Sequence, residues 1–240
     1  IRKHGLDISP SQMVSDMLYT LIVHEWGHHE YCPANEEGLT LILDGAYQAI
    51  EHREYDEDRI QQICFYIHNL FSDTILNTIN AHTDNDKDTY RRGMDFIYLL
   101  SSSHAFELAG HRADKAFTLF YNGNQVLCQG DPEINRMVGA YGPRFFFGFK
   151  RKRTKLLNIF TGDENLTRDA LNYELDGDNV VQVLERMQDV SLWREMTYDY
   201  TNLIYPYIRR MEESVENSFS RKGNNQCDKE GGKNGSNKGQ

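Results

Sequence analysis

Apolar residues recur every three or four positions through most of the first 219 residues, which is the repeat of one face of an α-helix. The first helix is expected to begin at Pro10, because Ser9, Pro10 and Gln12 form a capping-box start. It should continue past His28 and end before Pro33. The same periodicity predicts further helices over residues 38–52, 56–81, 89–110, 114–122, 166–175 and 180–218.

Signals for β-strands are few. Residues 126–128 and 144–149 are the two short runs that suggest a strand. Turns that contain Gly and Pro predict a loop-rich region over residues 130–148. We therefore predict a mainly α fold with few or no strands.

Composition narrows the classes of function. The chain has 240 residues, with 26 basic against 36 acidic side chains and a formal net charge of -10. This balance argues against a general nucleic-acid binder, because a phosphate backbone would be repelled except at a local basic patch. No apolar run approaches the roughly 18 residues of a transmembrane helix, so we expect no membrane partner.

Residues 220–240 are rich in Gly, Asn and Lys and contain no aliphatic side chain. We expect a disordered tail or linker there, following one domain over residues 1–219. The chain begins without Met, which suggests a piece of a longer protein with additional domains or partner proteins. Its four cysteines are scattered without a C-x-x-C pair, which is typical of reduced thiols in the cytoplasm.

The first predicted helix carries an H-E-x-x-H pattern at His24, Glu25 and His28. Two histidines four residues apart lie on one face of a helix, so both imidazoles can reach one metal ion. Glu25 is then placed to take a proton from a metal-bound water, which makes that water a nucleophile. The pattern predicts zinc held by His24 and His28, with Glu25 as general base.

The surroundings of the pattern strengthen this prediction. Leu18, Leu21 and Ile22 are expected to be buried on the side of the helix that carries the motif. Polar side chains on a buried face are unfavourable unless something such as a metal compensates them. Gly27 in mid-helix is unfavourable by about 1 kcal/mol relative to Ala, which is tolerable where a neighbouring element approaches closely.

A catalytic zinc needs a third protein ligand. The predicted helix over residues 56–81 has a polar stripe of Asn69, Asp73, Asn77 and Asn80. Asp73 is the anionic member and the better zinc ligand, so we predict that it completes the site. Asn69 and Asn77, one turn to either side, would support the site by hydrogen bonds. The alternative is a solvated polar face.

Other residues compete for these roles. His104, Glu107 and His111 share one face of a predicted helix and could supply a ligand instead of Asp73. His104, His111 or Tyr141 could stabilise an oxyanion. Cys32, one turn after His28, could reach the metal as a fourth ligand.

Residues 21–29 (LIVHEWGHH) and 68–77 (HNLFSDTILN) resemble the motifs of zincin-type metallopeptidases. They are most similar to bacterial proteins of this kind whose second motif has the form N-x-x-x-D-x-x-x-N. The resemblance covers about residues 10–82 and implies a zinc-dependent peptidase. In thermolysin-like gluzincins the second motif is N-E-x-x-x-D, with Glu as ligand, and that position here carries Asn69. Either Asp73 binds zinc itself, or it supports the site and the third ligand lies elsewhere.

Three hypotheses follow from these observations. The first is a zinc metallopeptidase that hydrolyses peptide bonds of a protein or peptide substrate. The second is a catalytically inactive zincin-like domain that binds or assembles with other parts of a larger protein. The third is a nucleic-acid binder that uses the basic and aromatic residues 144–155, which the acidic balance disfavours.

Overall fold

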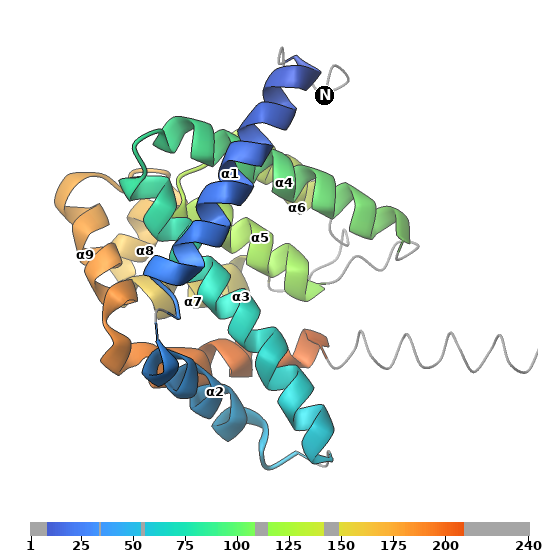
Figure 1. Cartoon of the computed structure of the whole chain (residues 1–240), viewed down its shortest axis with the longest axis vertical. Helices are drawn as coiled ribbons and strands as arrows, with labels where there is room; N and C mark the ends of the chain where they lie inside the picture. The colour runs from blue at the N-terminus through green and yellow to red at the C-terminus, as the bar shows by residue number, and fades with distance from the viewer. Residues whose placement is uncertain (1–8, 34, 54–55, 109–114, 142–148, 209–240) are drawn as a thin grey trace, which may run out of the picture.

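The computed structural model describes residues 9–33, 35–53, 56–108, 115–141 and 149–208. Among them the regular elements are helices, and no strand is present, so the predicted mainly α fold is confirmed (Figure 1). The elements are α1 Pro10–Glu30, α2 Glu36–Ile50, α3 Glu57–Thr83, α4 Lys87–Leu108, α5 Lys115–Leu127, α6 Pro132–Tyr141, α7 Phe149–Thr161, α8 Glu164–Leu171, α9 Gly177–Gln188, the short 3₁₀ helix η2 Val190–Leu192, and a last helix over 193–208.

Helix α3 is the centre of the fold. It contacts α1, α2, α4, α5 and α9 along its length (Figure 1). Phe71 on α3 packs against Phe160 on α7 and Tyr200 on the last helix, with ring centroids 5.5 and 5.8 Å apart. Because α3 is enclosed on several sides, a polar residue in its middle is fixed in position by neighbouring helices.

Helix α1 packs on α4 through small and polar side chains. The hydroxyl of Thr20 lies 3.1 Å from the carbonyl oxygen of Tyr90, and Arg92 Nε donates to the buried Asp16 carboxylate at 3.0 Å. A methyl group on Gly93 of α4 would overlap Thr20 Oγ1 and the backbone of Asp16. The two helices are therefore too close at this crossing for large apolar side chains.

The expectation that Leu18, Leu21 and Ile22 are buried is wrong. Their exposed fractions are 56%, 44% and 70%, whereas the buried residues of α1 are Asp16, Thr20 and Gly27. The close crossing with α4 explains the difference, since it selects small side chains for the buried face. The most apolar side of α1 consequently faces solvent.

Several predicted boundaries also change. The predicted strand at residues 126–128 is wrong, because α5 continues to Leu127; α6 occupies much of the predicted loop over 130–148. The predicted strand over 144–149 is described only at Phe149, where α7 begins. The single helix predicted over 180–218 is interrupted at Asp189. Residues 220–240 lie outside the described residues, as does the boundary at 219.

None of the described helices combines the length and the apolar composition that crossing a membrane requires.

Candidate metal centre

Three potential metal ligands lie together where α1 crosses α3. His24 and His28 come from successive turns of α1, and Asp73 comes from α3. Their ligand atoms all lie within 4.8 Å of one another. Asp73 Oδ1 is 3.3 Å from His28 Nε2 and 3.7 Å from His24 Nε2. The fold thus brings together the three residues that the sequence predicts as ligands.

In both histidines Nδ1 is engaged in a hydrogen bond, which leaves Nε2 for a ligand. His24 Nδ1 lies 2.8 Å from Asn77 Oδ1, and His28 Nδ1 lies 3.1 Å from the backbone oxygen of Cys32. Because both partners are acceptors, Nδ1 carries the proton in each ring and donates it. Such bonds orient metal-binding histidines and select their tautomer. Both Nε2 atoms are then free to bind a metal beside Asp73.

Two tyrosines of α4 hold Asn77 in its orientation. Asn77 Oδ1 also accepts a hydrogen bond from the Tyr90 hydroxyl at 2.8 Å, and Asn77 Nδ2 donates to the Tyr98 hydroxyl at 3.1 Å. The side chain of Asn77 is buried. Asn77 therefore makes the hydrogen bond predicted for a residue that supports the site. Nothing in the sequence pattern marked Tyr90 and Tyr98, because their role depends on how α4 packs on α3.

Gly27, between the two histidines, allows α1 to approach α3. A Cβ atom at this position would lie 2.9 Å from Asn80 Nδ2 and 3.3 Å from Leu76 Cδ1. Asn80 Nδ2 in turn donates to the backbone oxygen of Val23 at 3.3 Å. The close approach expected at this mid-helix glycine is therefore present, and it sets the distance between the histidines and Asp73.

The ligand group is accessible from solvent. The side chains of His24, His28 and Asp73 are 17%, 30% and 27% exposed. Glu25 is exposed and lines a groove on α1 together with Trp26 and His29, although no member of the ligand group lines that groove. The partial exposure of the three ligands suits a catalytic metal site, because one coordination position must admit water or substrate.

The charges around His28 favour a cation. The Asp73 carboxylate accepts a hydrogen bond from His28 and raises the pKa of His28, partial burial opposes that shift, and the charge of Glu25 adds to the increase. The carboxylate stabilises a positive charge at this point, whether it is a proton or a metal ion. A metal ion would compete with a proton for Nε2 of His28.

Cys32 and Asn69 do not take their predicted roles. Cys32 is not in the ligand group; it contributes its backbone oxygen, and burial raises the pKa of its thiol far above the ordinary value. Asn69 is exposed, and its Oδ1 lies 3.0 Å from Nδ1 of His68, which is outside the ligand group as well. The expected support of the site by Asn69 is therefore not met.

The rival residues lie beyond what the structure describes. His104 and Glu107 belong to α4, but their side chains are outside the described residues, and so are His111 and the side chain of Tyr141. Their predicted roles as ligands or oxyanion donors stay predictions.

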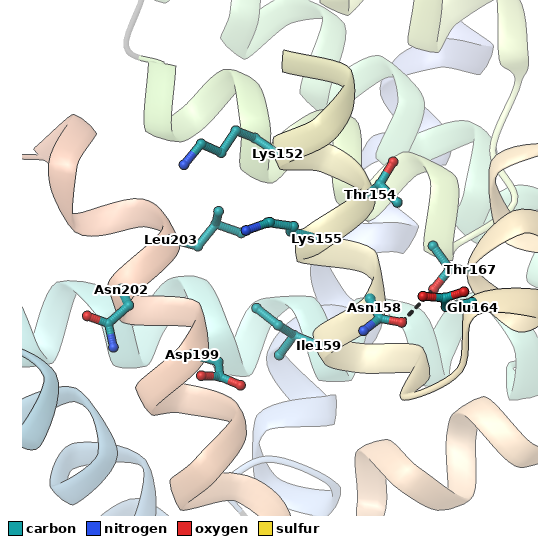
Figure 2. Close-up of a pocket in the computed structure, with 10 residues that line it drawn as sticks. All are labelled: Lys152, Thr154, Lys155, Asn158, Ile159, Glu164, Thr167, Asp199, Asn202 and Leu203. Atoms are coloured by element: carbon teal, nitrogen blue, oxygen red, sulfur yellow. Dashed lines mark hydrogen bonds between the residues drawn. The ribbon is translucent and has the colours of Figure 1, made fainter. Parts of the chain in front are cut away.

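A larger hollow of about 690 Å³ lies elsewhere, between α7, α8 and the last helix (Figure 2). Lys152 and Lys155 of α7 extend towards the last helix, which contributes Asp199 and Asn202. No member of the ligand group lines it, and its charges are of both signs. The described part of the basic segment, residues 149–155, forms the start of α7.

Comparison of the chain with protein-family models, with curated proteins and with solved structures found no match.

Proposed function

We propose that this protein is a zinc-dependent peptidase in which His24, His28 and Asp73 hold the metal and Glu25 is the general base. The observation that carries the proposal is the pair of Nδ1 hydrogen bonds to Asn77 and Cys32, which leave both Nε2 atoms for one ion beside a carboxylate. Two imidazoles and one carboxylate suit zinc, although other first-row divalent ions accept the same donors.

A bound zinc ion would polarise the scissile carbonyl and lower the pKa of a water molecule to about 7. The chain's own residues would do the rest. The Glu25 carboxylate, exposed beside the first ligand, would accept a proton from the attacking water and pass it to the leaving amine nitrogen. Asn77 would hold the His24 ring and prevent it from rotating away from Asp73.

The proposal extends to substrate and setting. A peptide or protein substrate, rather than another amide, follows from the resemblance of residues 21–29 and 68–77 to zincin-type metallopeptidases. A cytoplasmic setting is supported by Cys32, Cys64 and Cys128, which are free thiols in the described residues. Additional domains or partner proteins belong to the same proposal.

The test is peptide hydrolysis by zinc-loaded protein, measured with a mixture of unrelated peptides by mass spectrometry. Glu25→Gln should bind zinc with unchanged affinity but lose at least about 100-fold in rate, since general-base catalysis contributes about 100- to 10,000-fold. Glu30→Gln is the matched control, because Glu30 is an exposed glutamate on the same helix and should leave the rate unchanged.

Two results would contradict the proposal. If zinc-loaded wild type cleaves no peptide, the site is a structural one in a binding or assembly domain. If Glu25→Gln and wild type cleave equally fast, Glu25 is not the base and the hydrolysis has another origin.

A further inference from the structure

Bulky apolar side chains form an exposed stripe along α1. Five residues share this side of the helix, and we call them the α1 stripe: Val14, Leu18, Leu21, Ile22 and Trp26. Their exposed fractions are 50%, 56%, 44%, 70% and 64% in that order. Half of the ten exposed large apolar residues in the described chain belong to it. Contiguous apolar surface of this kind marks a binding site more often than scattered exposed residues do.

The α1 stripe leads directly to the proposed base. A groove of about 440 Å³ is lined by residues of the stripe and by two polar neighbours: Leu18, Leu21, Ile22, Glu25, Trp26 and His29. The stripe runs from Val14 to Trp26, about 18 Å along the helix. This length matches about five or six residues of an extended chain. The first turns of α1 extend beyond the other described helices (Figure 1).

We propose that the α1 stripe binds an extended apolar segment of the polypeptide substrate and leads it to Glu25. The substrates would accordingly be chains that expose several bulky apolar residues along one side of an extended segment, as unfolded or partly folded proteins do. This inference rests on the proposed peptidase function, because it assigns the bound segment as substrate.

The position of Glu25 favours a polypeptide over a second copy of this chain as the occupant of the α1 stripe. Two α1 stripes packed against each other would enclose the Glu25 carboxylate of each copy, and the residues that line this groove include no Lys or Arg. Burying a carboxylate without such a partner is strongly unfavourable. An extended peptide avoids this penalty, since its backbone N–H groups can donate hydrogen bonds to the carboxylate.

The charges on α1 also disfavour a lipid surface. Helices that lie on membranes carry Lys and Arg beside their apolar face. Between Lys3 and Arg53 the sequence contains neither Lys nor Arg, while Glu25 and Glu30 are exposed on α1. An anionic bilayer would therefore be repelled from this helix, and a polypeptide is the better occupant.

Tryptophan fluorescence can measure occupancy of the stripe without mutating it. The chain has two tryptophans; Trp26 is 64% exposed and Trp193 is 1% exposed, so acrylamide quenching reports on Trp26. The probe is a short synthetic peptide in which Leu, Ile and Phe alternate with Ser, and the control peptide has Ser at every position. Zinc-loaded Glu25→Gln protein is used so that the peptide is not consumed.

We expect the apolar peptide, but not the Ser peptide, to protect Trp26 from quenching. Ile22→Ser should weaken binding about 10-fold, because it removes one large buried side chain from the complex. Val14→Ser should weaken it about 3- to 10-fold. Val181→Ser is the matched control: Val181 is also 50% exposed but lies on α9, and its replacement should leave binding unchanged.

Three outcomes would overturn the inference. The first is no protection of Trp26 by the apolar peptide. The second is protection that grows with protein concentration alone, which would mean that a second copy covers the stripe. The third is tight binding of a peptide that zinc-loaded wild type never cleaves while it cleaves others, which would make the stripe a docking face for non-substrates. If wild type cleaves nothing at all, the proposed function fails, and the quenching result separately decides whether the stripe binds apolar segments.

Discussion

Replacing Asn77 by Ala tests how the site is supported. Asn77 Oδ1 accepts hydrogen bonds from His24 Nδ1 and the Tyr90 hydroxyl, both at 2.8 Å, and its Nδ2 donates to Tyr98 at 3.1 Å. The substitution removes all three bonds at once. His24 is then free to rotate, and two buried tyrosine hydroxyls lose these partners.

Two effects should follow, on affinity and on stability. Loss of the bond that orients a ligand typically weakens metal binding about 10- to 100-fold, or about 1.4–2.8 kcal/mol. Leaving a buried donor or acceptor without a partner is unfavourable by about 1–3 kcal/mol. We expect the free energy of unfolding to fall by roughly 2–4 kcal/mol, since the bonds share one side chain.

The assay is a zinc titration against a chromophoric chelator, combined with urea unfolding of the metal-free protein. Asn69→Ala is the matched control, because Asn69 is an exposed asparagine on the same helix whose side chain contacts His68 instead. Asn69→Ala should leave both quantities near those of wild type. Zinc affinity unchanged in folded Asn77→Ala would refute the claim that this amide orients His24.

Three further predictions concern the fold. Gly93→Ala should lower the free energy of unfolding by at least about 2 kcal/mol in urea titration, because the added methyl group overlaps the backbone of α1; an unchanged value would contradict the close crossing. Burial raises the pKa of Asp95 to about 7, so native protein holds this proton where unfolded chain has lost it, and stability falls as pH rises from about 4 to 7. The free energy of unfolding of Asp95→Asn relative to that of wild type should rise over that range by up to about 1.4 kcal/mol per pH unit. A difference that does not change with pH would refute this prediction. Burial lowers the pKa of His82 to about 4, so the stabilisation that the neutral imidazole gives the native protein above pH about 6.5 should be lost as the pH falls to about 4. The free energy of unfolding of His82→Gln should not show this loss in the same urea titration.

Two helix starts were predictable because a capping residue precedes them in the sequence. Ser9 accepts a hydrogen bond from the backbone N–H of Gln12, and Asp56 does the same for Arg59, so α1 and α3 begin where expected. Other boundaries depend on packing. Asn124 is a poor helix former, yet it is buried in α5 and donates to Thr74 of α3, so this helix continues past its predicted end.

Helix α7 was missed for a different reason. It begins with a run of basic residues that masks the apolar repeat, although Leu156 and Phe160 of the same helix are buried. The side of α1 that is buried was also unpredictable from periodicity, since apolar content usually marks the buried face. Here Gly93 brings α4 so close that Thr20 and Asp16 occupy that face instead.

The ligand group was predictable because its members follow local rules. His24 and His28 are separated by one helical turn, and Asp73 is the single carboxylate in the polar stripe of α3. Most partners of these residues are not local. The Cys32 backbone is only four residues from His28, but the bonds of Asn77 to His24 and to two tyrosines arise from tertiary packing, for which the sequence has no periodic signal.

The most direct test of the central claim is the zinc content of the purified, folded protein, measured by elemental analysis after zinc loading and dialysis. We predict about one zinc per chain in wild type and in His29→Ala, whose exposed imidazole neighbours His28 but lies outside the ligand group. His28→Ala and Asp73→Ala should lose the metal while their helical circular dichroism is unchanged. Folded wild type without zinc, or zinc retained in Asp73→Ala, would contradict the account.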